Sequence, residues 1–186
     1  MAFPRIAALA ALSTSAIAHA AAVALMPEGY SWLAHTTSES AAQGLPFAWV
    51  ARAGFVFMGL GALTLALAAG RELGAVAAVS LALFCVGSLA TAVFAHRPWI
   101  DGAPVDEFED LLHSIAASVI GASFCLAVVT AAIRRRRVPG LDCVAVAASI
   151  LLPIAMSVWP DRAGLLQRGM FVIAYLWLAR EALRLR

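Results

Sequence analysis

Residues 73–95, LGAVAAVSLALFCVGSLATAVFA, decide the fold of this chain because they contain no charged side chain. A membrane-spanning helix needs about 20 consecutive, mostly apolar residues, and this stretch has that length. A helix satisfies its own backbone groups inside hydrocarbon, whereas a closed barrel needs an alternation of polarity that this run lacks. The stretch therefore predicts a transmembrane helix.

The same kind of apolar run recurs on both sides of this stretch. Short separators with Pro or Gly divide the runs, as at Gly29, Gly70 and Pro160, and such residues mark turns. The further segments are 6–26, 47–69, 111–133, 141–158 and 163–183. We predict an all-α membrane bundle of six transmembrane helices, which forms a single integral membrane domain over residues 1–186.

Composition supports the same class. The chain is 63% apolar and only 13% charged, whereas soluble domains carry about 25% charged residues. Its net charge of +2 is too small to suggest a nucleic-acid partner. We expect a multi-pass protein of the cytoplasmic membrane, with the lipid bilayer as its surroundings; the oligomeric state is left open.

The first segment has an alternative interpretation as a signal peptide. Ala18-His19-Ala20 has the small residues of a cleavage site. The apolar run nevertheless continues past that site to Met26, at full spanning length, which favours an uncleaved helix.

Arginines predict the orientation, since positive residues concentrate on the cytoplasmic side. With the N-terminus inside, all arginines fall on the inner side except Arg52, Arg97, Arg162 and Arg168. The four consecutive arginines 134–137 are the strongest single determinant. We therefore predict that both termini are cytoplasmic.

Polar residues whose side chains could bind a ligand or take part in catalysis gather on the predicted outer side. Arg52 and Arg168 lie a few residues inside their helices, where a guanidinium snorkels outward or pairs with a carboxylate. Glu39 is the expected partner of Arg52. The arginines either form a structural ion pair that fixes loop to helix, or act together as an Arg pair that receives an anionic head group or carboxylate. The candidate ligand-binding residues are Ser38, Glu39, Arg52, Asp101, His113 and Arg168.

The acidic run before the fourth segment permits two interpretations. Its carboxylates suit a helix N-terminus, where they complement the helix dipole. Alternatively, Asp106, either Glu109 or Asp110, and His113 share one helix face and could bind a metal or relay a proton. His113 itself is either an interfacial histidine bonded to Asp110 or to a loop carbonyl, or a functional group. The cysteines and histidines form no recognised metal motif, so we assign no metal site, catalytic residue or cofactor.

A family resemblance covers nearly the whole chain. The residues that carry it are Gly29-Tyr30-Ser31, Ser38-Glu39, Arg52-Ala-Gly-Phe55, the stretch 94–101, His113, Gly164-Leu-Leu-Gln167-Arg168 and Trp177. Their order resembles a prokaryotic membrane family, domain of unknown function 998, which is distantly similar to the Frag1/DRAM/Sfk1 group. The chain departs from that pattern where Ser40 follows Glu39 in place of leucine, and where Phe94 and Pro98 are separated. The resemblance implies six helices and no established activity.

Three functions remain open at this level. The first is binding or movement of a lipid or small amphiphile, with Glu39, Arg52, His113 and Arg168 as the polar end of a pocket between helices. The second is a membrane-embedded, metal-dependent hydrolase. The third is an accessory or assembly subunit without its own chemistry.

Overall fold

The computed structural model describes residues 2–136 and 140–185, and within these ranges the chain is helical with no strand. The prediction of an all-α fold is confirmed. The elements are α1 (Ala2–Ala24), α2 (Thr37–Ser40), α3 (Ala48–Leu73), α4 (Ala75–Val93), α5 (Glu107–Arg135), α6 (Gly140–Val158), the short 3-10 helix η1 (Pro160–Arg162) and α7 (Ala163–Arg184).

Five of the described helices are long and apolar enough to cross a membrane: α1, α3, α4, α5 and α6. This is the character of a multi-pass membrane protein. The remaining long helix, α7, has 22 residues and carries several charged side chains. A sixth crossing and the inward orientation of the termini stay predictions.

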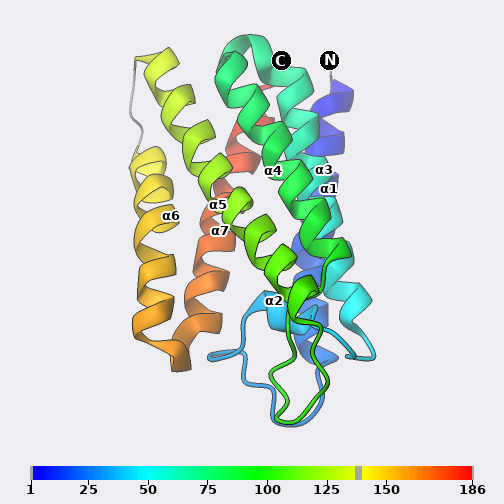
Figure 1. The fold of residues 1–186 in the computed structure, drawn as a ribbon. Helices are drawn as coiled ribbons and strands as arrows, with labels where there is room; N and C mark the ends of the chain where they lie inside the picture. The colour runs from blue at the N-terminus through cyan, green and yellow to red at the C-terminus, as the bar shows by residue number, and fades with distance from the viewer. Residues whose placement is uncertain (1, 137–139, 186) are drawn as a thin grey trace.

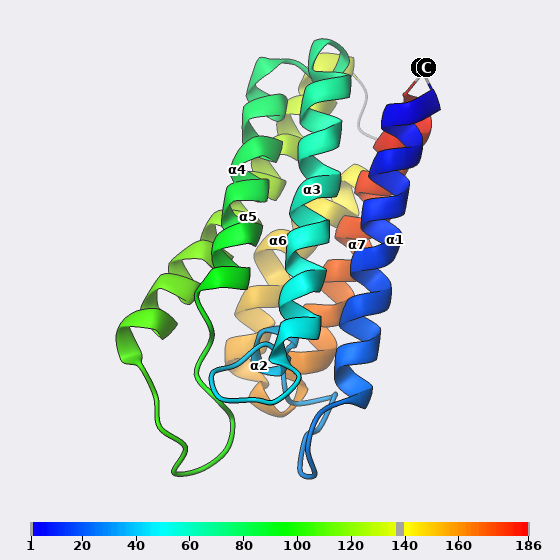
Figure 2. The ribbon, with the colours of Figure 1, turned by 90° about the vertical axis from the view of Figure 1, so that its right-hand side faces the viewer.

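The long helices form a bundle in which each packs on its neighbour along the chain, and α7 returns to pack against α1 (Figures 1 and 2). Helix α1 begins and α7 ends at the same end of the bundle (Figure 1), which we call the terminal end. The opposite end, here the loop end, is formed by residues 25–47, 94–106 and 159–162. Helix α5 crosses the bundle obliquely and draws away from α6 toward the loop end (Figures 1 and 2).

Local capping explains two boundaries that apolar runs alone do not predict. Helix α5 begins at Glu107, ahead of its apolar segment, because the Asp106 side chain accepts hydrogen bonds from the backbone N–H groups of Phe108 and Glu109, each at 3.0 Å. The short helix α2 was not expected from hydropathy. It forms because Thr36 and Glu39 make a capping box, in which each side chain receives the backbone N–H of the other residue.

Small residues set the spacing between neighbouring helices. A Cβ atom on Gly59 would lie 3.2 Å from the carbonyl oxygen of Cys85, and one on Gly87 would lie 3.0 Å from that of Ala116. Glycine at these positions lets α3 approach α4 and lets α4 approach α5 at backbone distance, as is common between membrane helices. The tight α3–α4 turn similarly uses Gly74, whose φ of 94° favours glycine.

Candidate functional site

The start of α7 holds the first loop in place. The Arg168 guanidinium donates to the backbone carbonyls of Trp32 and His35, at 2.6 and 2.9 Å, and to the Tyr30 hydroxyl at 2.6 Å. Burial raises the pKa of Tyr30, so this phenol stays protonated at neutral pH and donates to the Thr36 carbonyl at 3.1 Å. Arg168 therefore fixes the first loop by hydrogen bonds, and it forms no ion pair among the described residues.

Two neighbours of Arg168 complete this contact. The backbone N–H groups of Gly164 and Leu165 donate to loop carbonyls at 3.0 and 2.9 Å, which satisfies the first turn of α7. A Cβ on Gly164 would lie only 2.3 Å from the carbonyl oxygen of His35, so the loop fits against glycine alone. The Gln167 side-chain oxygen accepts the backbone N–H of Thr37 at 2.7 Å. We call Gly164, Gln167 and Arg168 the α7 clamp.

The clamp positions α2, which carries two of the predicted site residues. Ser38 is buried, whereas Glu39 receives the N–H and the hydroxyl of Thr36 at 2.6 and 2.8 Å. The expected pairing of Glu39 with Arg52 is not formed between these described residues. Instead, Arg52 donates its Nε–H to the carbonyl of Ala41 at 3.1 Å, because that carbonyl follows the last turn of α2 and lacks a helical donor.

The second loop is tied to the start of α5. Asp110 accepts from His96 Nδ1 at 2.5 Å and from the Arg97 backbone N–H and Nε–H at 2.8 and 2.9 Å. This bond with Asp110 raises the pKa of Arg97, which also pairs with Glu107 at the surface. The acidic run thus fixes the loop and caps α5, in agreement with the simpler of the two predictions.

His113 and Asp101 occupy very different surroundings. His113 is buried, its Nδ1 lies 2.8 Å from the carbonyl oxygen of Phe94, and its ring stacks on His96. The predicted bond to a loop carbonyl is thus present. Asp101 lies exposed in the loop 94–106. Among the described residues, no three His, Cys, Asp or Glu side chains could hold a metal ion together.

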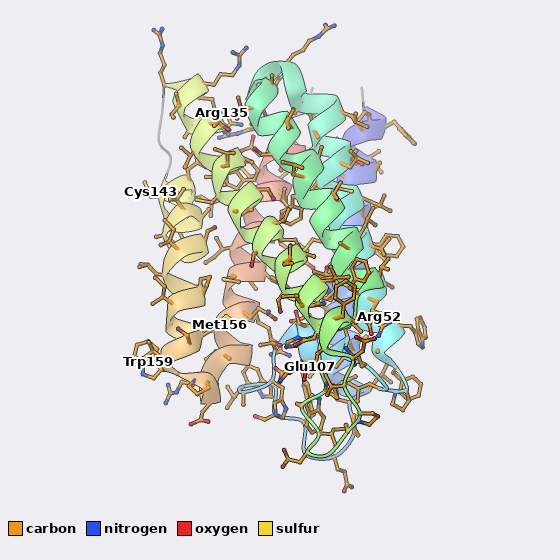
Figure 3. The ribbon with its side chains drawn as sticks, viewed as in Figure 1. Arg52, Glu107, Arg135, Cys143, Met156 and Trp159 are labelled. Carbon is orange, nitrogen blue, oxygen red and sulfur yellow. The ribbon has the colours of Figure 1, made fainter. Side chains whose placement is uncertain are left out.

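A large cavity opens between α5, α6 and α7. Its volume is about 690 Å³, within the range of roughly 300–1,000 Å³ typical of ligand pockets. The oblique course of α5 leaves this space, and α3 and α4 contribute Phe55, Met58 and Phe84 to its lining. On α6 the lining runs from Ala145 to Met156, roughly 17 Å of helix rise, and Figure 3 shows Met156 toward the loop end.

The lining is mostly apolar. Ser38, Thr91 and Gln167 contribute polar groups near the loop end, whereas Ser118 and Ser149 also line the cavity but donate their hydroxyls to carbonyls of their own helices. Of the six predicted ligand-binding residues, only Ser38 lines the cavity. Glu39, Arg52, His113 and Arg168 lie around the same end and support the loops, and Asp101 is remote from the lining. Figure 3 shows Arg52 and Glu107 at this end, opposite Arg135.

Sequence reasoning missed a buried charged cluster at the terminal end. Its members are Asp142, Glu181, Arg135, Arg180 and Arg184. Glu181 pairs with Arg135 and, at 2.8 and 3.2 Å, with Arg180 and Arg184, while Asp142 pairs with Arg180. Asp142 and Glu181 are only 1% and 2% exposed, so the cluster joins α5, α6 and α7 inside the protein. The signal for this cluster in the sequence was the presence of two acidic residues, Asp142 and Glu181, among the arginines of the terminal end.

A second polar network lies behind the cavity wall. Ser15 donates to the Gly54 carbonyl at 2.6 Å, and the Tyr175 hydroxyl lies 2.7 Å from Ser15 and 3.0 Å from His19 Nδ1. Because the Ser15 hydroxyl already donates its hydrogen bond to the Gly54 carbonyl, the Tyr175 hydroxyl donates to Ser15 and accepts from His19. These interhelical hydrogen bonds join α1 to α3 and α7.

Comparison with known proteins identifies the family. A sequence profile described as "Protein of unknown function (DUF998)" matches residues 6–183. The chain belongs to the DUF998 family. The predicted family is thereby confirmed, whereas no match links the chain to the Frag1 group. No curated protein and no solved structure matches it significantly. In this DUF998 chain, the motif Gly164–Arg168 that carried the resemblance forms the α7 clamp.

Proposed function

We propose that this chain binds a lipid or small amphiphile from the bilayer in the cavity between α5, α6 and α7. The observation that carries the proposal is a cavity of about 690 Å³ with a mostly apolar lining and with Ser38, Thr91 and Gln167 at its loop end. An alkyl chain fits such a lining because it leaves no buried polar group unpaired.

The dimensions and opening of the cavity support an occupant from the bilayer. The lining on α6 covers roughly 17 Å of helix rise, comparable with one leaflet of a hydrocarbon core about 30 Å thick. Leu126 on α5 and Ile150 on α6 line the cavity and are also 47% and 52% exposed on the protein surface. An alkyl chain therefore enters between α5 and α6 without first crossing water.

The alternatives have less support. A metal-dependent hydrolase needs converging ligands, and no such group occurs among the described residues. An accessory subunit needs no large internal cavity. The amphiphile site is expected to be outward-facing, since Ser38 and Gln167 line the cavity at the loop end and the loop end is the predicted outer side.

A cavity-filling substitution tests the proposal. A Cβ built on Gly121 meets no atom within 4 Å, so Gly121→Leu places its side chain in the cavity with little strain. The control is Ala147→Leu, on an exposed part of α6 outside the lining. Both variants and the wild type are purified in mild detergent and analysed by native mass spectrometry.

We expect wild type and Ala147→Leu to retain a bound amphiphile and Gly121→Leu to lose it at unchanged thermal stability. Equal retention by the two variants, or no retained amphiphile in any of them after incubation with lipid extract, would count against the proposal.

A further inference from the structure

At the loop end of the cavity, the Ser38 hydroxyl and the Gln167 side-chain NH2 have no partner among the described residues. Ser38 is 7% exposed, lines the cavity, and its hydroxyl has no hydrogen-bond partner there. Gln167 also lines the cavity and accepts the Thr37 backbone N–H through its side-chain oxygen. A backbone N–H can only donate, so this bond fixes the orientation of the amide and leaves the Gln167 NH2 group as the free donor.

No charge accompanies these two groups. The lining contains no Asp, Glu, Arg, Lys or His among the described residues. The nearby arginines are bonded to the protein itself: Arg168 to two loop carbonyls and a phenol, and Arg52 to the Ala41 carbonyl. An anionic head group inside the cavity would therefore lose its hydration without a charged side chain in the lining to bond it, which is unfavourable.

We infer that the cavity selects a neutral amphiphile, whose head presents an uncharged oxygen acceptor, such as an ester carbonyl or a hydroxyl, to Ser38 and Gln167. This inference rests on the proposed function and names its ligand class. The NH2 of Gln167 donates to that oxygen, and the Ser38 hydroxyl donates to it or accepts from a hydroxyl. The other two clamp residues, Gly164 and Arg168, serve recognition indirectly because they hold the first loop and α2, and thus Ser38, against the cavity.

A pair of probes that differ by one phosphate tests the head-group class. Monopalmitoylglycerol and its phosphate ester, a lysophosphatidic acid, have the same chain and the same ester. Each competes with radiolabelled monopalmitoylglycerol for the purified full-length protein in detergent micelles. We expect the neutral probe to compete at least tenfold better.

Equal or stronger competition by the phosphate probe overturns the inference and leaves the proposed amphiphile cavity standing. If neither probe binds and Gly121→Leu has no effect on retained lipid, the proposed function fails together with the inference. The two failures are thus distinguishable.

Variants assign the selectivity to the two residues. Ser38→Ala removes the free hydroxyl, and Gln167→Glu keeps the acceptor for Thr37 while it replaces the free NH2 with oxygen. Ser38→Ala is expected to weaken binding of monopalmitoylglycerol about fivefold, the loss of one hydrogen bond, and Gln167→Glu by at least as much, because it also adds a carboxylate to the lining. Ser123→Ala is the control, because that buried hydroxyl already donates to the Ile120 carbonyl and lies outside the lining. Unchanged affinity in both Ser38→Ala and Gln167→Glu overturns the assignment.

Discussion

The buried cluster at the terminal end makes a sharp prediction about stability. Glu181→Gln keeps the shape of the side chain but removes its charge, and it leaves Arg135 and Arg180 beside a neutral amide. Breaking a buried ion pair by loss of one partner costs about 3–5 kcal/mol of unfolding free energy. For a chain of this size, 1 kcal/mol corresponds to about 2–4 °C in Tm, so we expect Tm to fall by roughly 6–20 °C.

Glu107→Gln is the matched control because the same chemical change removes an ion pair at the surface. The Glu107 side chain is 72% exposed and pairs with Arg97, whereas the Glu181 side chain is 2% exposed. Exposed pairs contribute little to stability, so Tm of this variant is expected to stay near that of wild type. The assay is thermal unfolding in one detergent, followed by circular dichroism. Similar shifts in the two variants would refute the reasoning that burial makes the Glu181 charge essential.

Three further predictions concern the loop end and the topology. Gly164→Ala places a Cβ 2.3 Å from a loop carbonyl, so we expect it to lower Tm and expose the first loop to protease, whereas Gly169→Ala, with its nearest atom 4.0 Å away, should do neither. In Tyr175→Phe, Tyr30 is the only remaining tyrosine; burial favours its neutral form, so its ultraviolet titration midpoint should lie above the ordinary 10.0, and a midpoint at or below 10.0 contradicts the buried site. With both termini inside, a green fluorescent protein fused to the C-terminus should fluoresce and an alkaline phosphatase fused at Asp101 should be active; the reverse result overturns the orientation.

The sequence predicted the end of the bundle at which the polar part of the candidate site lies, but only one of the residues that line it. The Ser38-Glu39 motif predicts Ser38 as a ligand-binding residue, and Ser38 lines the cavity. Arg52 and Arg168 were chosen because a guanidinium near a helix end needs a partner, and both have one, but the partners are backbone carbonyls rather than a ligand or Glu39. Sequence spacing indicates that a charged group must be satisfied; it does not indicate which atom satisfies it.

The sequence by itself determined that this chain is an all-α membrane protein, because apolar runs of spanning length and short breaker-rich separators depend only on local composition. The order of its short motifs, and not its hydropathy, indicated the DUF998 family. Tertiary structure alone decided the cavity, the α7 clamp and the buried cluster. The cavity exists because α5 crosses obliquely and leaves α6, and the cluster exists because Asp142, Arg135 and Glu181 meet from three helices. Such encounters depend on helix crossing angles, which are set by close contacts at residues such as Gly59 and Gly87 and which hydropathy does not encode.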